Sequence, residues 1–196
     1  MTLTKDAGDA LTAVVSAGVR STAACLAEVA HQPWRVLSVA LSQDEAGPFA
    51  DAHASVGGDH YGSHFTFQGG SILVLFSGKT GYLVTNAFTR DFQDRIEHMP
   101  KRESVALGEV SNVMLNPLVG HLAKSWGRRL IISAPETKIG SPRDHLTRAL
   151  SHYGADRLAA TFFAHLDSPQ LFSECRIMLF LDRGLVAGLA GLTALS

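Results

Sequence analysis

The chain has 196 residues, of which 46% are hydrophobic and 18% are charged. This balance excludes an intrinsically disordered chain, because disorder requires few apolar residues and many charges. The formal net charge of -1 offers no basic field for phosphates, which argues against nucleic-acid binding as the main role. The length fits one domain, or two closely packed halves.

In the first half, residues 9–31 carry apolar side chains at helical spacing, and the predicted helix ends before Pro33. A strand, a loop rich in glycine, aspartate and alanine, two further strands and a second helix are expected to follow. We place the strands at 34–41, 65–67 and 71–76, the loop at 42–62 and the helix at 80–92.

A polar connector at 91–101 leads to the second half, which begins with a long helix at 104–126. Gly127 marks its end, because glycine tolerates the left-handed conformation that follows many helices. Ser141 and Pro142 have the pattern of a helix start. The remaining elements are strands at 129–133, 158–166 and 176–181 and a terminal helix at 182–195.

The order of elements repeats, which predicts an internally duplicated α+β domain. Each half reads as a helix, three strands and a helix, and neither half has enough apolar surface for a core of its own. We therefore expect both halves to share one largely antiparallel sheet, with both long helices on the same face. The chain, 1–196, is predicted to be a single domain with pseudo-repeats at about 8–92 and 104–195.

Cysteines and targeting signals add little. Cys25 and Cys175 belong to no metal or redox motif and are expected to be small buried residues. The N-terminus contains Lys5, Asp6 and Asp9 and no apolar segment of the signal-peptide type. Apolar runs elsewhere are interrupted before the roughly 18 residues that a membrane span needs. We predict a soluble, cytoplasmic protein without membrane insertion.

The long helix at 104–126 has one face on which chemistry is conceivable. Glu109, Asn112 and Asn116 are three and four residues apart, so they share one face of the helix. A carboxylate can pair with a cation, and a carboxamide can orient a water molecule. On residue types alone, an ordinary solvated helix face is the better explanation, because Glu and Asn are common on exposed helix faces. Pro117 lacks a backbone N–H and is expected to kink or interrupt the helix.

The spacing beyond the helix is more specific. Residues 107–136 resemble the signature segment of the CheC/CheX family, phosphatases of the chemotaxis response regulator CheY. The family motif is a glutamate, two residues, an asparagine, then 22 residues and a proline, and Glu109, Asn112 and Pro135 match these positions. The sequence departs from the pattern at Val105, where the family prefers Asp or Ser. It departs again at 116–117, where Asn-Pro replaces a glycine and a small or polar residue.

The resemblance implies hydrolysis of the aspartyl phosphate on a phosphorylated CheY-type response regulator, in chemotaxis or two-component signalling. It implies that Asn112 orients the attacking water, that Glu109 pairs with a cationic side chain of the receiver domain, and that Asn116 contributes to partner binding. Mg²⁺ is expected on the receiver, with no cofactor or metal held by this chain. Aligning the first helix with the second puts Ala13 and Ser16 at the motif positions, so we expect a single active site.

The resemblance leaves a second function open. The FliM-like middle domains of the flagellar switch share this fold and bind partners without catalysis. Exposure of Glu109 and Asn112 separates the two hypotheses: adjacent, solvent-facing side chains favour the phosphatase, and a side chain buried in an internal hydrogen bond favours the binding module.

Other candidate sites are weaker. His53, His60 and His64 are expected in one solvated loop, since their spacing matches no common zinc pattern. The tripeptide at 78–80, Gly-Lys-Thr, lacks the upstream glycine of a phosphate loop, because residue 73 is leucine. The chain also contains no Gly-x-Ser-x-Gly elbow that would indicate a hydrolase triad.

Overall fold

A computed structural model describes residues 3–42, 57–89, 102–151 and 158–193 of the chain. Within these ranges it contains five α-helices, one short 3-10 helix and six strands. The helices are α1 (Lys5–Ala30), α3 (Gly78–Thr89), α5 (Arg102–Trp126), α6 (Pro142–Ser151), α7 (Arg183–Thr193) and the 3-10 helix η1 (Pro169–Leu171). The strands are β1 (Arg35–Ser42), β2 (His60–Phe67), β3 (Gly70–Ser77), β4 (Glu136–Gly140), β5 (Leu158–Ser168) and β6 (Ser173–Asp182).

All six strands form one sheet in the order β1-β5-β6-β3-β2-β4, and every neighbouring pair is antiparallel. In the two repeats, β1 corresponds to β4, β2 to β5 and β3 to β6. When the sheet is read from the β4 edge and each strand is replaced by its counterpart, the same order results. The two halves therefore meet at the β3–β6 pair about a pseudo-two-fold axis. The predicted fold class is confirmed, whereas the limits of the repeats, 8–92 and 104–195, extend outside the described residues and stay a prediction.

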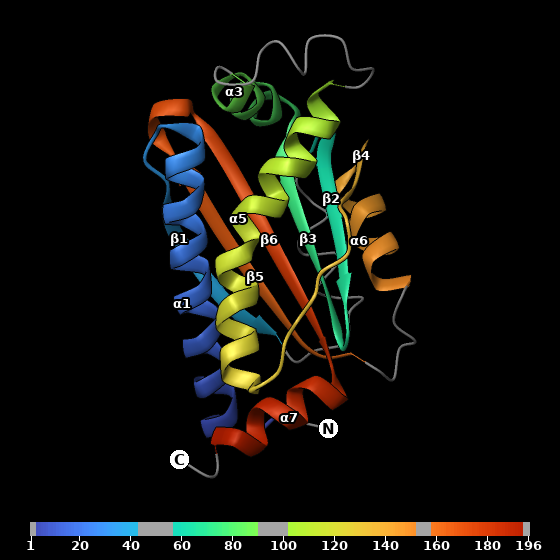
Figure 1. The fold of residues 1–196 in the computed structure, drawn as a ribbon. Helices are drawn as coiled ribbons and strands as arrows, with labels where there is room; N and C mark the ends of the chain where they lie inside the picture. The colour runs from blue at the N-terminus through green and yellow to red at the C-terminus, as the bar shows by residue number, and fades with distance from the viewer. Residues whose placement is uncertain (1–2, 43–56, 90–101, 152–157, 194–196) are drawn as a thin grey trace.

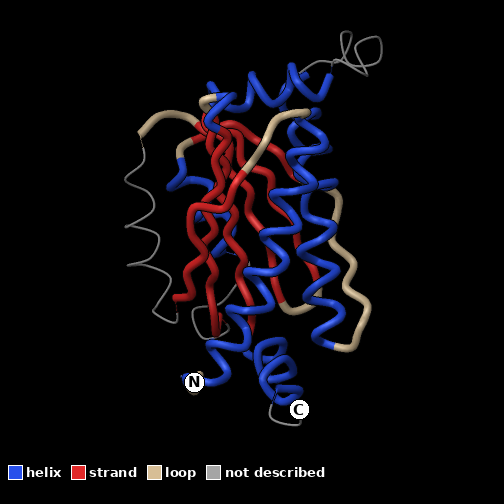
Figure 2. Tube along the Cα trace, turned by 90° about the vertical axis from the view of Figure 1, so that its left-hand side faces the viewer, coloured by secondary structure: helices blue, strands red, loops and turns tan. Residues whose placement is uncertain are grey.

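The elements form layers (Figure 1). Helices α1 and α5 run antiparallel across one face of the sheet, α3 and α7 lie at its two ends, and α6 lies on the other face. Figure 2 shows the long helices as a layer alongside the strands. Both long helices thus cover the same face, as predicted.

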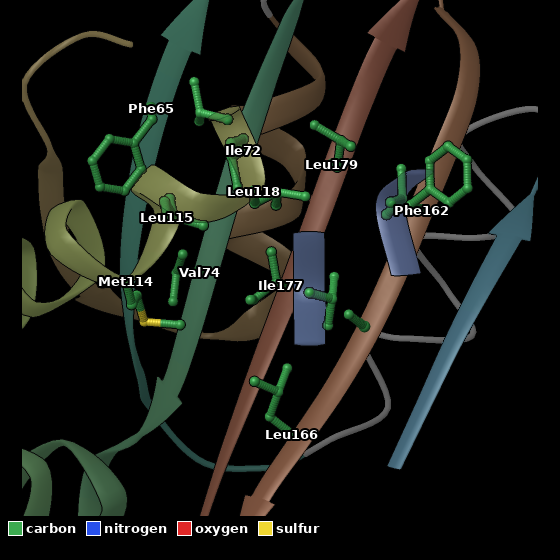
Figure 3. Packing of buried hydrophobic residues seen from close by; sticks show 14 of the residues in the cluster. Phe65, Ile72, Val74, Met114, Leu115, Leu118, Phe162, Leu166, Ile177 and Leu179 are labelled. Atoms are coloured by element: carbon green, nitrogen blue, oxygen red, sulfur yellow. The ribbon is translucent and has the colours of Figure 1, made fainter. Parts of the chain in front are cut away.

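The main core fills the space between the long helices and the sheet. Figure 3 shows α5 side chains such as Met114, Leu115 and Leu118 next to strand residues such as Phe65 and Ile177. A smaller cluster, including Leu73, Phe180 and Leu146, buries α6 against the opposite face. Burial on both faces explains why β3 and β6 are nearly continuous apolar runs.

Helix α1 is also long and apolar enough, by length and composition only, to cross a membrane. The sequence-based expectation that no segment reaches this threshold is therefore wrong for α1. Its inner face, including Leu11, Val15 and Val19, is buried in the main core. The core helix of a folded domain is built in the same way.

The predicted strand at 129–133 is wrong. Residues 129–135 have no regular secondary structure, and β4 begins at Glu136. The backbone N–H of Ser133 does donate to Thr66 at 2.8 Å, but Pro135 has no N–H with which to continue a ladder. The actual strand, β4, is a polar strand at the edge of the sheet. A search of the sequence for apolar runs does not detect such a strand.

The predicted loop at 42–62 is also partly wrong. His60, at its end, begins β2, and His64, which we expected in the same solvated loop, is also in β2; both are buried, and His53 lies outside the described residues. Strand β2 pairs with β3 on one side and β4 on the other, so its backbone is fully used despite a polar sequence. Cys175 is buried as expected, but Cys25 is only half-buried.

Candidate functional site

The outer face of α5 carries the motif residues. Glu109 and Asn116 are exposed, and Asn112 is half-buried. Val105 and Val113, with 41% and 37% of their surfaces exposed, lie one turn before and one turn after Glu109. The inner face carries the buried apolar residues Leu107, Val110, Met114, Leu115, Leu118 and Leu122. Packing of that inner face fixes the rotation of the helix and so presents Glu109 and Asn112 to solvent.

The side chains of this face are available to a partner. Within the part of the chain that the structure describes, Glu109, Asn112 and Asn116 make no hydrogen bond or ion pair through their side chains. Neither motif residue is held in an internal hydrogen bond. This is the arrangement that favours a catalytic or docking role over a structural one.

Pro135, the third motif position, lies against the same turn of α5. A Cβ atom placed on Gly108 would be 3.3 Å from Pro135 Cγ and 2.9 Å from Thr137 Oγ1, so the chain crosses the helix closely there. Thr137 is tied to β2 by a 2.8 Å hydrogen bond between its Oγ1 and Ser63 Oγ. The 22 residues between Asn112 and Pro135 run down the rest of α5 and back to its first half. The 22-residue spacing of the motif thus brings Pro135 back to the turn of α5 that carries Glu109.

Sequence reasoning did not single out Gly108, Thr137 or Ser63 as residues that position the site. A glycine inside a helix is unfavourable unless something must approach the backbone. Gly108, directly before Glu109, carried that signal.

The equivalent face of α1 lacks the functional groups. The two long helices end alike: His31 and Gly127 both adopt the left-handed conformation, and the N–H groups of Gln32 and Arg128 donate to Ala27 and Ala123, each at 3.2 Å. This register aligns Ala13 with Glu109 and Ser16 with Asn112. Ala13 is exposed and Ser16 is half-buried, and neither carries a charge.

Close contact with α1 holds α5 in place. A Cβ on Gly18 would lie 2.7 Å from Leu118 Cδ1 and 3.0 Å from its Cα, so the glycine lets the helix axes approach. Ser21 Oγ and His121 Nε2, 3.3 Å apart, form a hydrogen bond across the same seam. Pro117 does not interrupt α5, which continues to Trp126.

Two histidines with shifted pKa values lie elsewhere, on the sheet face that α6 covers. His145 Nε2 lies 3.0 Å from the carbonyl oxygen of His60, and its ring packs directly over Gly62. Burial lowers the pKa of His145 and of His60 below the ordinary value. Both are on the side of the sheet away from Glu109, so they are not part of the α5 face.

The described residues contain no cluster of three or more His, Cys, Asp and Glu side chains that could hold a metal ion. The Gly-Lys-Thr tripeptide begins α3, where the Thr80 hydroxyl accepts a hydrogen bond from Ser77 Oγ at 2.8 Å. It therefore serves the start of a helix.

No protein-family model and no curated protein sequence matches the chain. Solved structures do. FliY from Thermotoga maritima matches with a TM-score of 0.70 and 15% identity over 99% of this chain and 98% of its own. The FliM middle domain from H. pylori matches with a TM-score of 0.67 and 7% identity over 97% and 99%. The chain has the fold of the CheC/CheX/FliM group.

A third similar structure is a complex of two proteins. It is the CheX-CheY-BeF3-Mg²⁺ complex from Borrelia burgdorferi, with a TM-score of 0.52, 14% identity, and coverage of 86% of this chain and 97% of that one. The neighbours therefore include a CheX in complex with CheY as well as FliY and a FliM middle domain. Fold alone does not separate these roles, so the decision rests on the residues of α5.

Proposed function

We propose that this chain is a phosphatase that hydrolyses the aspartyl phosphate on the receiver domain of a CheY-type response regulator. One observation carries the proposal. Glu109 and Asn112 face solvent without internal partners, and Pro135 packs against the turn that bears them. The similarity to a CheX seen in complex with CheY supports this assignment.

The first role is docking. Glu109 is exposed on a helix face flanked by Val105 and Val113, so it can pair with a cationic side chain of the receiver while the two valines cover its apolar stem. Asn116, one turn beyond Asn112, extends the contact with a neutral donor and acceptor. The pair of contacts fixes the orientation of α5 over the phosphorylated aspartate.

The second role is positioning water. An acyl phosphate is already activated, so the reaction needs in-line attack more than covalent help. The Asn112 carboxamide holds a water molecule in line with the phosphorus; the water oxygen bonds to phosphorus as the bond to the aspartyl oxygen breaks. The products are the aspartate carboxylate and inorganic phosphate, which keeps the protons of the water. A carboxamide does not take up the proton of the water at neutral pH, so Asn112 acts by orientation.

The metal belongs to the substrate in this proposal. Mg²⁺ on the receiver neutralises charge on the phosphoryl oxygens, and this chain contributes no ligand to it. A soluble, cytoplasmic location belongs to the same proposal, since the expected substrate is a phosphorylated receiver domain.

The direct test is a panel of phosphorylated cognate receivers, each followed for loss of phosphate with and without this protein. Acceleration for at least one receiver, reduced on the order of 10²-fold by Asn112→Ala, is the expected result. Binding of a receiver with no acceleration by wild type would refute the phosphatase.

A specific observation favours a second candidate, a non-catalytic binding module of the flagellar switch. FliY and the FliM middle domain superpose more closely, and over more of the chain, than the CheX of the CheY complex. A module of that kind would bind a partner through α5 and leave the phosphate in place. The receiver panel separates the two candidates, because only the phosphatase changes the rate.

A further inference from the structure

Three histidines lie together on the sheet face that α6 covers. His60 and His64 stand on either side of Gly62 in β2, and the alternation of a strand turns all three residues to the same face. His145 of α6 packs onto Gly62, since a Cβ atom on this glycine would be 2.4 Å from His145 Nδ1. The three imidazoles therefore form one group between β2 and α6, which we call the histidine cluster.

The histidine cluster is buried. The exposed fractions of His60, His64 and His145 are 5%, 6% and 6%. His145 Nε2 donates to the carbonyl oxygen of His60 at 3.0 Å, and His60 Nδ1 donates to the carbonyl oxygen of Gly58 at 3.1 Å. Histidine is the side chain whose charge ordinarily changes between pH 5 and 8. The contact between α6 and the sheet thus contains three groups that can change charge in this range.

Positive charges face the cluster from two elements. Arg176 of β6 faces His60, and Arg148 of α6 faces His145. The strand registers place Arg176 and Gly62 in one row across the sheet, two strands apart. Burial, together with these guanidinium charges, keeps the pKa of His60 and His145 below the ordinary value.

Negative charges near the cluster are exposed to water. They belong to Asp144 of α6, Asp59 and Glu136 of β4, which face His145, His60 and His64 in that order. Asp144 accepts a 2.7 Å hydrogen bond from Ser141 Oγ, and Glu136 pairs with Lys138 and Arg148. Solvent weakens the attraction of such carboxylates for a buried imidazolium. Protonation of the cluster is therefore poorly compensated while α6 stays docked.

Helix α6 is attached to the sheet separately from the main core (Figure 1). Its buried face consists of Pro142, His145, Leu146 and Ala149. The apolar cluster beneath it contains the strand residues Leu73, Leu75, Met178 and Phe180. Among the described residues, this cluster shares no member with the main core. Release of α6 would therefore leave the packing of α1 and α5 on the sheet intact.

Protons must favour the released state. When α6 leaves the sheet, the imidazoles reach water and regain the ordinary pKa of about 6.5. Each histidine that binds a proton only after release shifts the equilibrium toward release about tenfold per pH unit below that value, until the pH reaches its docked-state pKa.

We propose that α6 is a pH-sensitive cover, docked over β2 and β3 at neutral pH and released on acidification, which exposes the apolar sheet face beneath it. The cover is independent of the phosphatase proposal, because it lies on the opposite face of the sheet from Glu109 and Asn112.

Hydrogen exchange of single backbone amides, measured by NMR on the full chain at about pH 7.5 and pH 5, tests the cover. A helix of 10 residues is not stable by itself, so release of α6 opens its amides to exchange. Protection factors, which are corrected for the direct effect of pH on exchange, should fall at least about tenfold at Leu146 and Ala149. At the lower pH they should also be at least about tenfold below those of Val110 and Leu118 in α5.

His145→Gln keeps a donor for the His60 carbonyl and cannot take up a proton, so it should reduce the pH effect on the α6 amides at least about threefold. His60→Gln serves the same purpose if His145→Gln does not fold. The matched control is His121→Gln, which removes a histidine at the seam between α1 and α5 and should leave the pH effect on α6 unchanged.

Three results would each overturn the proposal. The first is protection of α6 that does not depend on pH. The second is one common protection factor for α6 and α5 at the lower pH, which would indicate unfolding of the whole domain. The third is an unchanged pH effect on α6 in a folded cluster variant.

Discussion

The thiol of Cys25 lies 3.6 Å from the backbone carbonyl oxygen of Val113, across the seam between α1 and α5. In an uninterrupted α-helix that carbonyl would accept a hydrogen bond from the residue four positions later. That residue is Pro117, which has no N–H to donate. The thiol thus takes the place of the missing donor, and a defect in one helix becomes a link to the other.

This relationship predicts that Cys25→Ala lowers the free energy of unfolding by about 0.5–1 kcal/mol, the net value of a modest hydrogen bond. Cys25→Ser keeps a donor and should lose less. Urea denaturation measures both. In a Pro117→Ala background the helix regains its own donor, so Cys25→Ala should cost less there than in wild type. Equal costs in the two backgrounds would show that the thiol does not compensate for the proline.

The proposed division of labour on α5 predicts different kinetic defects. Asn112→Ala should slow hydrolysis on the order of 10²-fold at saturation and leave receiver binding nearly intact, because water orientation matters mainly in the transition state. Glu109→Ala should instead raise the concentration needed for half-saturation, and the defect should shrink at high salt because the charge contact is screened. Single-turnover loss of phosphate, measured across protein concentrations, resolves both effects. The reverse pattern would rule out these roles.

The degenerate face of α1 predicts that one site accounts for all activity. Asn112→Ala should have no substantial residual activity, since Ala13 and Ser16 offer neither a carboxylate nor a carboxamide. Restoring the rate through α1 should need both Ala13→Glu and Ser16→Asn, because docking and water orientation are separate requirements. The same single-turnover assay applies. If Asn112→Ala stays active without these additions, the single-site assignment is incorrect.

Two glycines of α5 form a matched pair. Gly108→Ala places a methyl group 2.9 Å from Thr137 Oγ1 and should destabilise the protein by about 1–3 kcal/mol through overpacking. It should also reduce the proposed phosphatase activity, since Pro135 must move away from position 108, next to Glu109. Gly120→Ala meets nothing within 4 Å and should stabilise the helix by about 0.5–1 kcal/mol. Thermal unfolding of both variants tests the contrast, and equal effects would contradict it.

Stability should rise with pH between about 5 and 7. Burial keeps the pKa of His145 and His60 below the ordinary value of 6.5, so the unfolded chain binds protons that the folded chain does not. Their contribution to stability is therefore complete above about pH 6.5 and is lost as the pH falls toward the folded-state pKa values. Urea denaturation at about pH 5 and pH 8 measures the difference. His145→Gln should reduce it, and an unchanged pH dependence would exclude His145 as a source.

Sequence pattern predicted the parts of this fold in which periodicity reports burial. Helices α1 and α5 and strands β3 and β6 are long apolar elements, and the polar positions of α5 followed from spacing alone. Strand β4 was missed, because the edge of a sheet needs only a backbone ladder and its side chains stay polar. The histidines of β2 misled for a related reason: α6 covers them, and nothing local in the sequence reports that contact.

The candidate site was predictable in part. The spacing of Glu109, Asn112 and Pro135 identified the residues, and helix geometry placed the first two together. The contact of Pro135 with Gly108 depends on where a long return segment crosses α5, which no short-range pattern encodes. The hydrogen bond that anchors this crossing joins Thr137 to Ser63 in β2. Tertiary contacts of this kind had to come from the structure.

The strand order of the sheet has a consequence for how such a chain can arise. A sheet that reads the same from both edges can be assembled by two identical half-length chains, joined along the strand that corresponds to both β3 and β6. Such a homodimer would carry two equal motif helices, one from each copy. Fusing the copies into one chain frees each helix to change by itself, so α1 can lose its carboxylate while α5 keeps the pair.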